Sequence, residues 1–499
     1  MASLQGNDEI LDNWGGYGGN RAWHTFAWVI NDMVKFNQKA KKLRKKYPRF
    51  FYKSYSYRIS NNNLEMSFNF HIEPGISFSP KVIIKGINGR RINAIGEKVM
   101  NNFVFHLGMI EIPSYWKAVC SPEIIIEAGS LDVFQQNWWR NLILNGMGQF
   151  FFENKINFRN SNFLSIKAKG KSSGLLYTRK LNNKGFLAAV GGGKDSAVTL
   201  EILKKTKKNL SCFSLNPSAS SLGMMKAAGC SRQISISRII DKNLLLLNKK
   251  GYLNGHTPFS AYLAFLSVLL GVLFDRKYAV FSNEHSANEG NVEYLGRIMN
   301  HQWSKTFEFE QMFRQYSKKY LAKDMEYFSL LRPLYEIQIA KIFANYPKYF
   351  LLFISCNKAQ KTNSGRYKPS GKWCGACPKC LFVYLILYPF IDRNILKGIF
   401  KQDILNKKEL LPVFLELTGE RGFKPFECVG TKKEILSALY LSLEKNRDLN
   451  LPFLLNYFKK NILPKYPNLK NESKKLMISW NKENNLTSIV KDDILRMLK

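Results

Sequence analysis

Hydrophobic and polar residues change their spacing near residue 180, so the chain has two differently patterned parts. Before that point, alternation in FYKSYSYRI and LEMSFNFHI predicts an antiparallel hairpin that turns around Asn61–Asn63. FSPKVIIKGI predicts a further strand, and VFQQNWWRNLILNGMGQFF has the spacing of an amphipathic helix. SIKAKGKSSG, residues 165–174, is rich in Gly, Ser and Lys, which predicts a loop at a domain boundary.

After residue 180, short apolar runs alternate with segments of helical spacing. The predicted strands are FLAAV (186–190), LSCFSLN (210–216), ISISRII (234–240) and YAVFSNE (278–284). Glycines follow the first strand, a helix opens at Ser196, and a buried helix runs from about Pro258 to Phe274. Strands that alternate with helices predict a parallel sheet with right-handed crossovers.

The length of 499 residues predicts two or three domains, at roughly 100–200 residues each. We predict an α/β fold in three parts. Residues 1–175 form an N-terminal α+β domain, and residues 176–395 form the α/β domain with the parallel sheet. Residues 396–499 form a mainly helical C-terminal region, because Leu, Ile and Lys recur there.

Composition adds a strong basic charge to this picture. Hydrophobic residues make up 45% and charged residues 22%, which excludes a wholly disordered chain. Lys+Arg is 75 against Asp+Glu 37, a net charge of +38, which favours anionic partners such as nucleotides, nucleic acid or lipid headgroups. Lys and Asn are abundant all along the chain, so compositional drift explains the charge equally well.

The chain shows no sequence signal for a membrane or for export. Its longest apolar stretch, AYLAFLSVLLGVLF (261–274), is shorter than the roughly 20 residues that a membrane-spanning helix needs. MASLQGNDEILDNWGG has no basic and apolar leader, so no signal peptide is predicted. Eight cysteines in so long a chain do not suggest a disulfide framework.

The sharpest chemical signal is AVGGGKDSAVTL, residues 189–200. Three glycines between a strand and a helix bring backbone N–H groups and the positive helix end close to an anion, and Lys194 adds a full charge. The segment lacks the Gly-Lys-Ser/Thr of a Walker loop and the G-x-G-x-x-G of a dinucleotide fold. A glycine-rich turn without a ligand is the alternative.

The order Gly-Gly-x-Asp-Ser resembles the pyrophosphate loop (PP-loop) of the N-type ATP pyrophosphatases, although Gly191 stands where their consensus has Ser. The resemblance implies a parallel-sheet fold like the adenine-nucleotide α-hydrolases, and activation of a substrate by adenylylation. It also implies ATP, a divalent ion (Mg²⁺ or Mn²⁺) and a catalytic role for Asp195. The implied ATP-binding residues are Gly191, Gly192, Gly193, Lys194, Asp195 and Ser196.

Four cysteines lie close together in the sequence. Cys374, Cys377 and Cys380 stand in WCGACPKC, and Cys356 precedes them in FISCN. Four soft thiolates suit a structural zinc ion, and PP-loop enzymes that make deazapurines hold zinc in a similar arrangement. The alternatives are reduced cysteines that only pack below the nucleotide, or a catalytic thiol among the four.

Several segments after the predicted strands are unusually polar: NGHTPFSA (254–261), SNEHSANEGNVEY (282–294), NHQWSK (300–305) and LRPLYE (331–336). Ligands of open α/β sheets bind outside the carboxyl ends of strands. The predicted substrate-binding residues are therefore His256, Thr257, Asn283, Glu284, Asn288, Glu289, His301 and Arg332. In KPFECVGTKKE (424–434), Thr431 and Glu434 predict a capping box that starts a helix.

Together with LRPLYEIQIA, SCN, WCGACPKC and KPFECVG, these segments resemble one family over residues 185–435. It is the MurL family of ATP-dependent UDP-N-acetyl-α-D-muramoyl-L-alanyl-L-glutamate epimerases. The resemblance implies a cytoplasmic step of peptidoglycan synthesis, in which the terminal L-Glu of a UDP-linked muramoyl dipeptide becomes D-Glu while ATP yields AMP and diphosphate. Glu427 and Cys428 are the candidate bases, with Glu289 and His285 as alternatives.

Two rival interpretations stay open at this point. One is a PP-loop enzyme that modifies tRNA or forms a deazapurine, which the basic charge and the cysteines would suit. The sequence shows no dedicated RNA-binding module, so a nucleic-acid partner is not expected. The other is a nucleotide-binding scaffold without catalysis, against which the intact Lys194, Asp195 and Ser196 argue.

Overall fold

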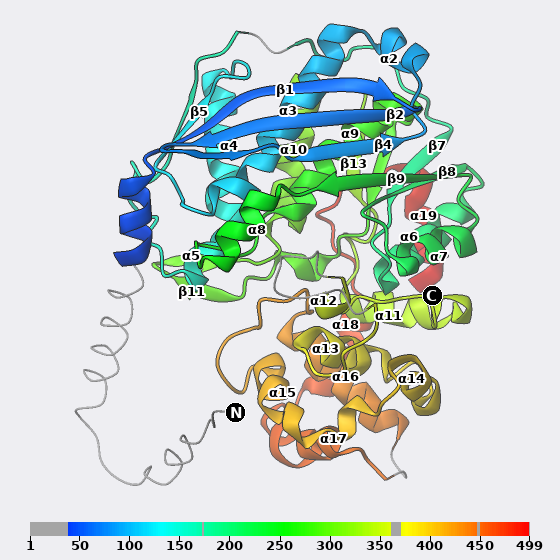
Figure 1. Ribbon diagram of the computed structural model, residues 1–499. Coiled ribbons are helices and arrows are strands. Elements are labelled where there is room, and N and C mark those ends of the chain that lie inside the picture. Colours follow the sequence, from blue (N-terminus) through cyan, green and yellow to red (C-terminus); the bar gives the residue numbers. More distant parts are fainter. Residues whose placement is uncertain (1–37, 172–173, 361–370, 447–449, 499) are drawn as a thin grey trace.

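One mixed β-sheet is the centre of the computed structural model, which describes residues 38–171, 174–360, 371–446 and 450–498 (Figure 1). Within these residues the sheet has eleven strands in the order β13-β10-β7-β8-β9-β4-β2-β1-β5-β6, with β3 paired to β2. The strands are β1 (Arg49–Ser60), β2 (Asn63–Ile72), β3 (Ile76–Phe78), β4 (Lys81–Lys85), β5 (Glu123–Ile126), β6 (Ser165–Ala168), β7 (Gly185–Ala189), β8 (Asn209–Leu215), β9 (Arg232–Ile239), β10 (Tyr278–Phe281) and β13 (Glu326–Ser329).

The five strands from β13 to β9 are parallel to one another, as the alternation of strands and helices predicts. The four predicted strands are β7, β8, β9 and β10, whereas β13 was not predicted. Its segment EYFS (326–329) is only four residues long and gives too short a pattern to recognise. Because the strands are parallel, the carboxyl ends of β7, β10 and β13 lie at the same edge of the sheet.

The N-terminal strands continue this sheet. The predicted hairpin is confirmed as β1 and β2, which pair antiparallel and turn at Asn61 and Asn62. Strand β4 pairs antiparallel with β9, so the sheet runs across the boundary expected at residue 175, and the domain limits stay a prediction. The loop predicted at residues 165–174 was wrong for Ser165–Ala168, because β5 offers an edge to which this segment adds in parallel as β6.

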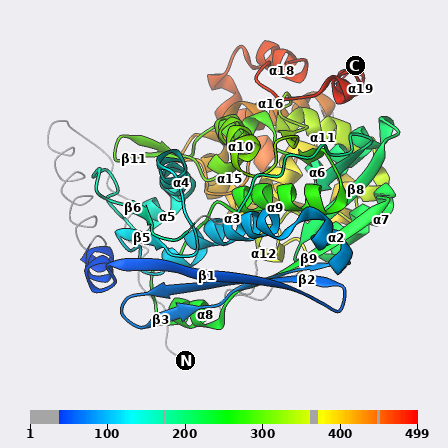
Figure 2. The same ribbon diagram turned by 90° about the horizontal axis from the view of Figure 1, so that it is seen from above.

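Helices cover both faces of the sheet at β13, β10, β7 and β8, whose residues belong to two hydrophobic cores, whereas the core residues of the strands from β9 to β6 all belong to one of them (Figure 2). Alternate residues of β7 show this, since Leu187 belongs to one core while Phe186 and Ala188 belong to the other. The helices of this part are α2 (Gly89–Ile95), α3 (Glu97–Trp116), α4 (Val133–Gly146), α5 (Gly148–Glu153), α6 (Lys194–Lys205), α7 (Ala219–Ala228), α8 (Lys242–Lys249), α9 (Phe259–Phe274), α10 (Phe307–Tyr320) and α11 (Glu336–Ala344). The buried helix predicted before Phe274 is confirmed as α9.

The C-terminal region is helical, as predicted, and lies below the sheet in the view of Figure 1. The helices from residue 357 onward are α12 (Asn357–Gln360), α13 (Pro378–Leu387), α14 (Arg393–Phe400), α15 (Leu411–Thr418), α16 (Lys432–Lys445), α17 (Phe453–Tyr457), α18 (Leu469–Met477) and α19 (Ser488–Leu498). Of these, α12 and α13 precede residue 396 and so lie in the part predicted as the α/β domain. The capping box of Thr431 and Glu434 is confirmed at the start of α16. The last helix, α19, returns to contact α6 and α11.

Two further findings bear on the sequence expectations. Cys212 and Cys230 form a disulfide between β8 and the end of α7, which the cysteine spacing did not predict. None of the described helices is long and apolar enough to cross a membrane. The segment on which the signal-peptide prediction rests, residues 1–16, lies outside the described residues.

Candidate active site

The glycine loop, residues 191–196, connects β7 to α6 as the sequence predicts. The helix begins at Lys194, two residues earlier than predicted, because Gly193 takes the N-cap position and no side chain caps it. Gly192 has a φ of +89°, a conformation that glycine adopts without strain. Its carbonyl accepts a hydrogen bond from Ile354 N–H (2.9 Å), so a segment that follows α11 in the sequence fixes the loop. A helix start without a side-chain cap leaves its N–H groups to an anion.

A cluster of buried charges adjoins this loop. The Lys194 ammonium donates to Asp195 Oδ1 (2.5 Å) and to the Glu336 carboxylate at the start of α11. The Lys379 ammonium, from the first turn of α13, lies 4.0 Å from Glu336 Oε1. The cluster therefore combines segments that follow β7 and β13 with a helix of the C-terminal region.

Burial and charge act against each other in this cluster. Burial by itself would lower the pKa of Lys194, but the carboxylates of Asp195 and Glu336 raise it above its ordinary value. Burial and the neighbouring Asp195 raise the pKa of Glu336. Burial likewise raises the pKa of Glu284, whose charge interacts with that of Lys305. The ammonium groups are already buried, so an anion that binds there would not have to displace a full hydration shell from them.

A thiol, Cys428, lies next to the same cluster, since the Lys379 ammonium donates to the Cys428 carbonyl. Cys428 Sγ accepts a hydrogen bond from the Lys305 ammonium (3.2 Å) and lies 3.9 Å from Nε2 of His301. Burial would raise the pKa of Cys428, yet the ammonium groups of Lys305 and Lys379 lower it below its ordinary value. The arrangement favours a thiolate, which is the reactive form of cysteine.

Two histidines stand beside this thiol. The rings of His256 and His301 lie 4.4 Å apart between their centroids, although 45 residues separate them in the sequence. Burial and the charge of Lys305 lower the pKa of His301 to about 3. Burial and His301 lower the pKa of His256 well below its ordinary value. Both rings are therefore neutral, and His256 Nδ1 is buried without a hydrogen-bond partner.

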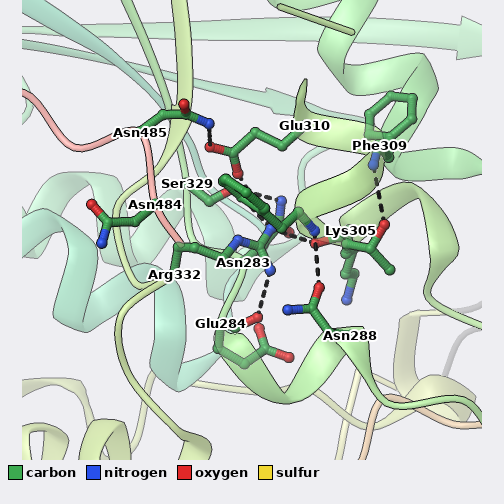
Figure 3. Close-up of polar contacts among 12 residues, drawn as sticks. Asn283, Glu284, Asn288, Lys305, Phe309, Glu310, Ser329, Arg332, Asn484 and Asn485 are labelled. Atoms are coloured by element: carbon green, nitrogen blue, oxygen red, sulfur yellow. Dashed lines mark hydrogen bonds and ion pairs between the residues drawn. The ribbon is translucent and has the colours of Figure 1, made fainter. Parts of the chain in front are cut away.

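Arg332 connects two segments of the site. Its side chain is fully buried and donates to the backbone carbonyls of Glu284 (2.7 Å) and Lys305 (2.5 Å). Figure 3 shows the guanidinium between Glu284 and the Glu310 carboxylate, which in turn accepts from Asn485 (2.8 Å). Direct substrate binding by Arg332 stays a prediction; in the structure Arg332 holds two segments of the site, and its Nε is buried without a hydrogen-bond partner.

Other predicted ligands are also occupied by protein groups. Asn283 donates to the Ser329 hydroxyl at the end of β13 (3.0 Å), and Asn288 accepts from the Phe307 N–H (2.9 Å) that begins α10. Glu289 pairs with Lys424 (3.2 Å). These contacts fix the loops between the strand ends and α10.

The remaining candidates lie nearby. The Thr257 carbonyl accepts from Phe259 N–H (2.7 Å) where α9 begins. His285 packs against the ring of Tyr335, and its Nδ1 is buried without a hydrogen-bond partner. Burial raises the pKa of Glu427, and its Oε2 is likewise buried without a partner.

The cysteine cluster comes together as the spacing suggests. The sulfur atoms of Cys356, Cys374, Cys377 and Cys380 all lie within 4.8 Å of one another. Cys374 Sγ is 3.6 Å from Cys380 Sγ, and Cys356 Sγ is 4.0 Å from Cys377 Sγ. Zn–S bonds of about 2.3 Å in a tetrahedron place the sulfur atoms roughly 3.8 Å apart, so these four fit a zinc ion.

Sequence reasoning missed four residues of the site, namely Gln149, Lys305, Glu336 and Lys379. Three of them stand at the end of, or within, the segments NHQWSK, LRPLYE and WCGACPKC, which were recognised for other residues. A lysine in such a segment is normally a solvated surface group, so its burial was not predictable. Gln149 lies in a part of the sequence that showed no chemical motif.

The site places buried lysines, carboxylates and a thiol around an anion-binding turn, which is typical of an enzyme active site. Comparison with known proteins shows which class of enzyme it is. The model of the MurL N-terminal domain matches residues 41–330, and that of the MurL C-terminal domain matches residues 352–471. The chain therefore belongs to the MurL family. No solved structure matches it.

Three curated relatives carry the name UDP-N-acetyl-α-D-muramoyl-L-alanyl-L-glutamate epimerase. The protein from Xanthomonas oryzae pv. oryzae is 33% identical over 67% of this chain and 72% of its own. That from Micromonospora sp. is 34% identical over 68% and 74%, and that from Salinispora tropica is 40% identical over 52% and 56%. These relatives are epimerases by name, so the chain is an enzyme of the isomerase class.

Proposed function

We propose that this enzyme inverts the terminal L-Glu of UDP-N-acetylmuramoyl-L-alanyl-L-glutamate to D-Glu, in a cytoplasmic step of peptidoglycan precursor synthesis. The names of the relatives supply the substrate. The observation that carries the mechanism is the position of the Cys428 thiol beside Lys305, in the same cluster of charges as the glycine loop. One site thus holds a group suited to bind polyphosphate and a group suited to move a proton.

ATP is proposed to bind with its phosphates at residues 191–196. The N-terminus of α6 and the ammonium groups of Lys194 and Lys379 offer the positive charge that phosphates need. A Mg²⁺ or Mn²⁺ ion prefers oxygen ligands, which the phosphates and the partly exposed Asp195 carboxylate would supply. When bound, the ion stabilises negative charge on the leaving diphosphate.

Adenylylation solves the chemical problem of the inversion. Removal of the α-proton from a carboxylate would place a second negative charge beside the first. Joining the carboxylate to AMP cancels its charge and makes an electron-withdrawing acyl group, so a protein base can take the α-proton. Reprotonation from the opposite face inverts the centre, and hydrolysis then releases the product and AMP.

Of the two candidate bases, Cys428 has the better surroundings. The ammonium groups of Lys305 and Lys379 favour its thiolate form. Glu427 faces Asn357 and the cysteine cluster, and burial raises its pKa. Glu427 therefore lies toward the cysteine cluster and Cys428 toward the cluster of charges. We assign proton abstraction to Cys428.

We further propose a structural zinc ion in the cysteine cluster. Lys379 lies between Cys377 and Cys380, and its ammonium reaches both Glu336 and the Cys428 carbonyl. The metal would therefore fix the turn that carries Lys379 toward the phosphates. Its role is structural, because all four ligands come from the protein.

Metal analysis of protein purified without chelators is expected to find one zinc per chain. Cys380→Ser should lose the zinc and lower the thermal unfolding temperature, since a structural metal contributes directly to stability. Cys120→Ser is the matched control, because Cys120 is equally buried but lies outside the cluster. Zinc-free wild-type protein with normal folding would leave only packing as the role of these cysteines.

The proposed function is tested with UDP-N-acetylmuramoyl-L-alanyl-L-glutamate, ATP and Mg²⁺, followed by chiral analysis of the glutamate released on hydrolysis. We expect D-Glu, AMP and diphosphate to form together. Bulk tRNA is the contrasting substrate, because the net charge of +38 would suit it. Diphosphate release with tRNA and none with the dipeptide would instead support a tRNA-modifying enzyme.

A further inference from the structure

A chain of hydrogen bonds leads to the thiol from the N-terminal part of the protein. Helix α5 carries Gln149 and Glu153 one turn apart, and Gln149 Nε2 donates to Glu153 Oε1 (2.6 Å). A carboxylate only accepts hydrogen bonds, so this contact turns the amide NH₂ of Gln149 toward Glu153. The amide oxygen of Gln149 then faces Nδ1 of His301, at 2.5 Å.

This contact determines which nitrogen of His301 carries the proton. The amide oxygen can only accept, so Nδ1 must be the N–H donor. Burial and the charges of Lys305 and Lys379 keep the ring neutral, with a pKa of about 3. A neutral ring has one N–H, so Nε2 presents its lone pair, and it lies 3.9 Å from Cys428 Sγ.

The two loops that carry this pair are tied together. Asn291 accepts from the His301 backbone N–H (2.8 Å) and donates to the Pro425 carbonyl (2.8 Å), three residues before Cys428. The His301 ring also packs against the ring of His256. The ring and the sulfur are therefore held in fixed positions from three different parts of the sequence.

We propose that Gln149 is a positioning residue that fixes the His301 tautomer, so that Nε2 accepts a hydrogen bond from the Cys428 thiol. The inference rests on the proposed function, which it extends to the N-terminal part of the chain. In the reaction the Cα–H bond of the acyl-adenylate breaks, its electron pair moves into the acyl carbonyl, and the proton forms S–H on Cys428. His301 Nε2 accepts from this S–H and stabilises it.

The other tautomer would act in the opposite direction. An Nε2–H would donate to the Cys428 thiolate, stabilise its negative charge and make it a weaker base. Without an acceptor at Nδ1, the His301 ring is free to adopt that form. Gln149 thereby favours the proton on sulfur, which is the product side of the abstraction step.

The tautomer is tested first, in the absence of substrate. The chain has only six histidines, so its ¹⁵N-histidine NMR spectrum is simple to assign. We expect His301 to show a protonated Nδ1 and an unprotonated Nε2. Gln149→Leu should shift the ring toward the Nε2–H form. A wild-type His301 with Nε2–H would overturn the inference whatever the enzyme does.

Kinetics then test the role in catalysis. Gln149→Leu is expected to slow inversion and α-proton exchange about 100-fold, the lower end of what a positioned proton-transfer group contributes. ATP–diphosphate exchange, which reports adenylylation alone, should fall at least about 10-fold less, because proton abstraction takes no part in that step. Gln149→Glu keeps an acceptor and should restore most of the inversion rate.

Glu153→Gln provides a second, milder variant should Gln149→Leu fold poorly. It allows the Gln149 amide to turn either way, so we expect a loss of inversion between those of wild type and Gln149→Leu. Equal losses of inversion and of ATP–diphosphate exchange, or no loss of inversion in any variant, would overturn the inference. A wild-type enzyme with the expected tautomer but neither inversion nor exchange would count against the proposed function instead.

Discussion

Asp195→Ala is expected to reduce diphosphate release by about 100- to 1000-fold, the range found when one electrostatic group is removed from an active site. Asp195 is the second residue of α6, its side chain is 27% exposed, and it contacts the Lys194 ammonium at 2.5 Å. In the proposed mechanism its charge orients Lys194 and would be available to the metal ion that accompanies ATP. Loss of the carboxylate should therefore weaken both contacts of the leaving diphosphate.

The matched control is Asp324→Ala at the opposite edge of the sheet. Asp324 also pairs with a lysine, Lys277, at 2.9 Å, but this pair lies at the amino-terminal ends of β10 and β13. We expect diphosphate release to stay near the wild-type rate in this variant. Thermal unfolding of both variants separates lost chemistry from lost folding. Full diphosphate release in Asp195→Ala would remove the glycine loop from the mechanism.

The parallel strands were predictable because burial on both faces leaves nearly continuous apolar runs such as FLAA in β7. The continuation of the sheet was not, because the pairing of β4 with β9 joins residues about 150 positions apart and depends on tertiary packing. Strand β6 shows the same limit. Its composition indicates a loop, yet the neighbouring β5 edge makes it a strand.

The residues of the site likewise differ in how far local sequence patterns predict them. The glycine loop and the cysteine cluster are local patterns whose spacing itself constrains the geometry: the glycines lie between a strand and a helix, and the four cysteines come together. The thiol site is different, because Gln149, His301 and Cys428 come from three distant segments. No local spacing links them, and only the fold shows that a glutamine without a motif lies 2.5 Å from the histidine ring.

The disulfide of Cys212 and Cys230 was missed for a related reason. Eight cysteines allow many pairings, and chain length alone argues against disulfides only on average. The two cysteines are brought together by the crossover from β8 through α7. The pattern of strands and helices predicts such a crossover but not the positions of its individual side chains.

Inversion carried out in D₂O is expected to place deuterium on the α-carbon of the D-Glu product, and omission of ATP is expected to stop both inversion and exchange. The reason is electrostatic. The free carboxylate leaves the α-proton too weakly acidic, whereas the acyl-adenylate lets the Cys428 thiolate remove it. The abstracted proton then exchanges with solvent, or the new proton comes from a second group that has done so.

The substrate contains its own control, because the L-Ala carboxyl is held in an amide bond and cannot be adenylylated. Mass spectrometry should therefore find deuterium at the glutamate α-carbon and none at that of alanine. Inversion at an undiminished rate without ATP would refute activation of the carboxylate, whatever the fold. Cleavage of ATP to ADP and phosphate would replace the acyl-adenylate by an acyl-phosphate, and the glycine loop would then bind a different leaving group from the one proposed.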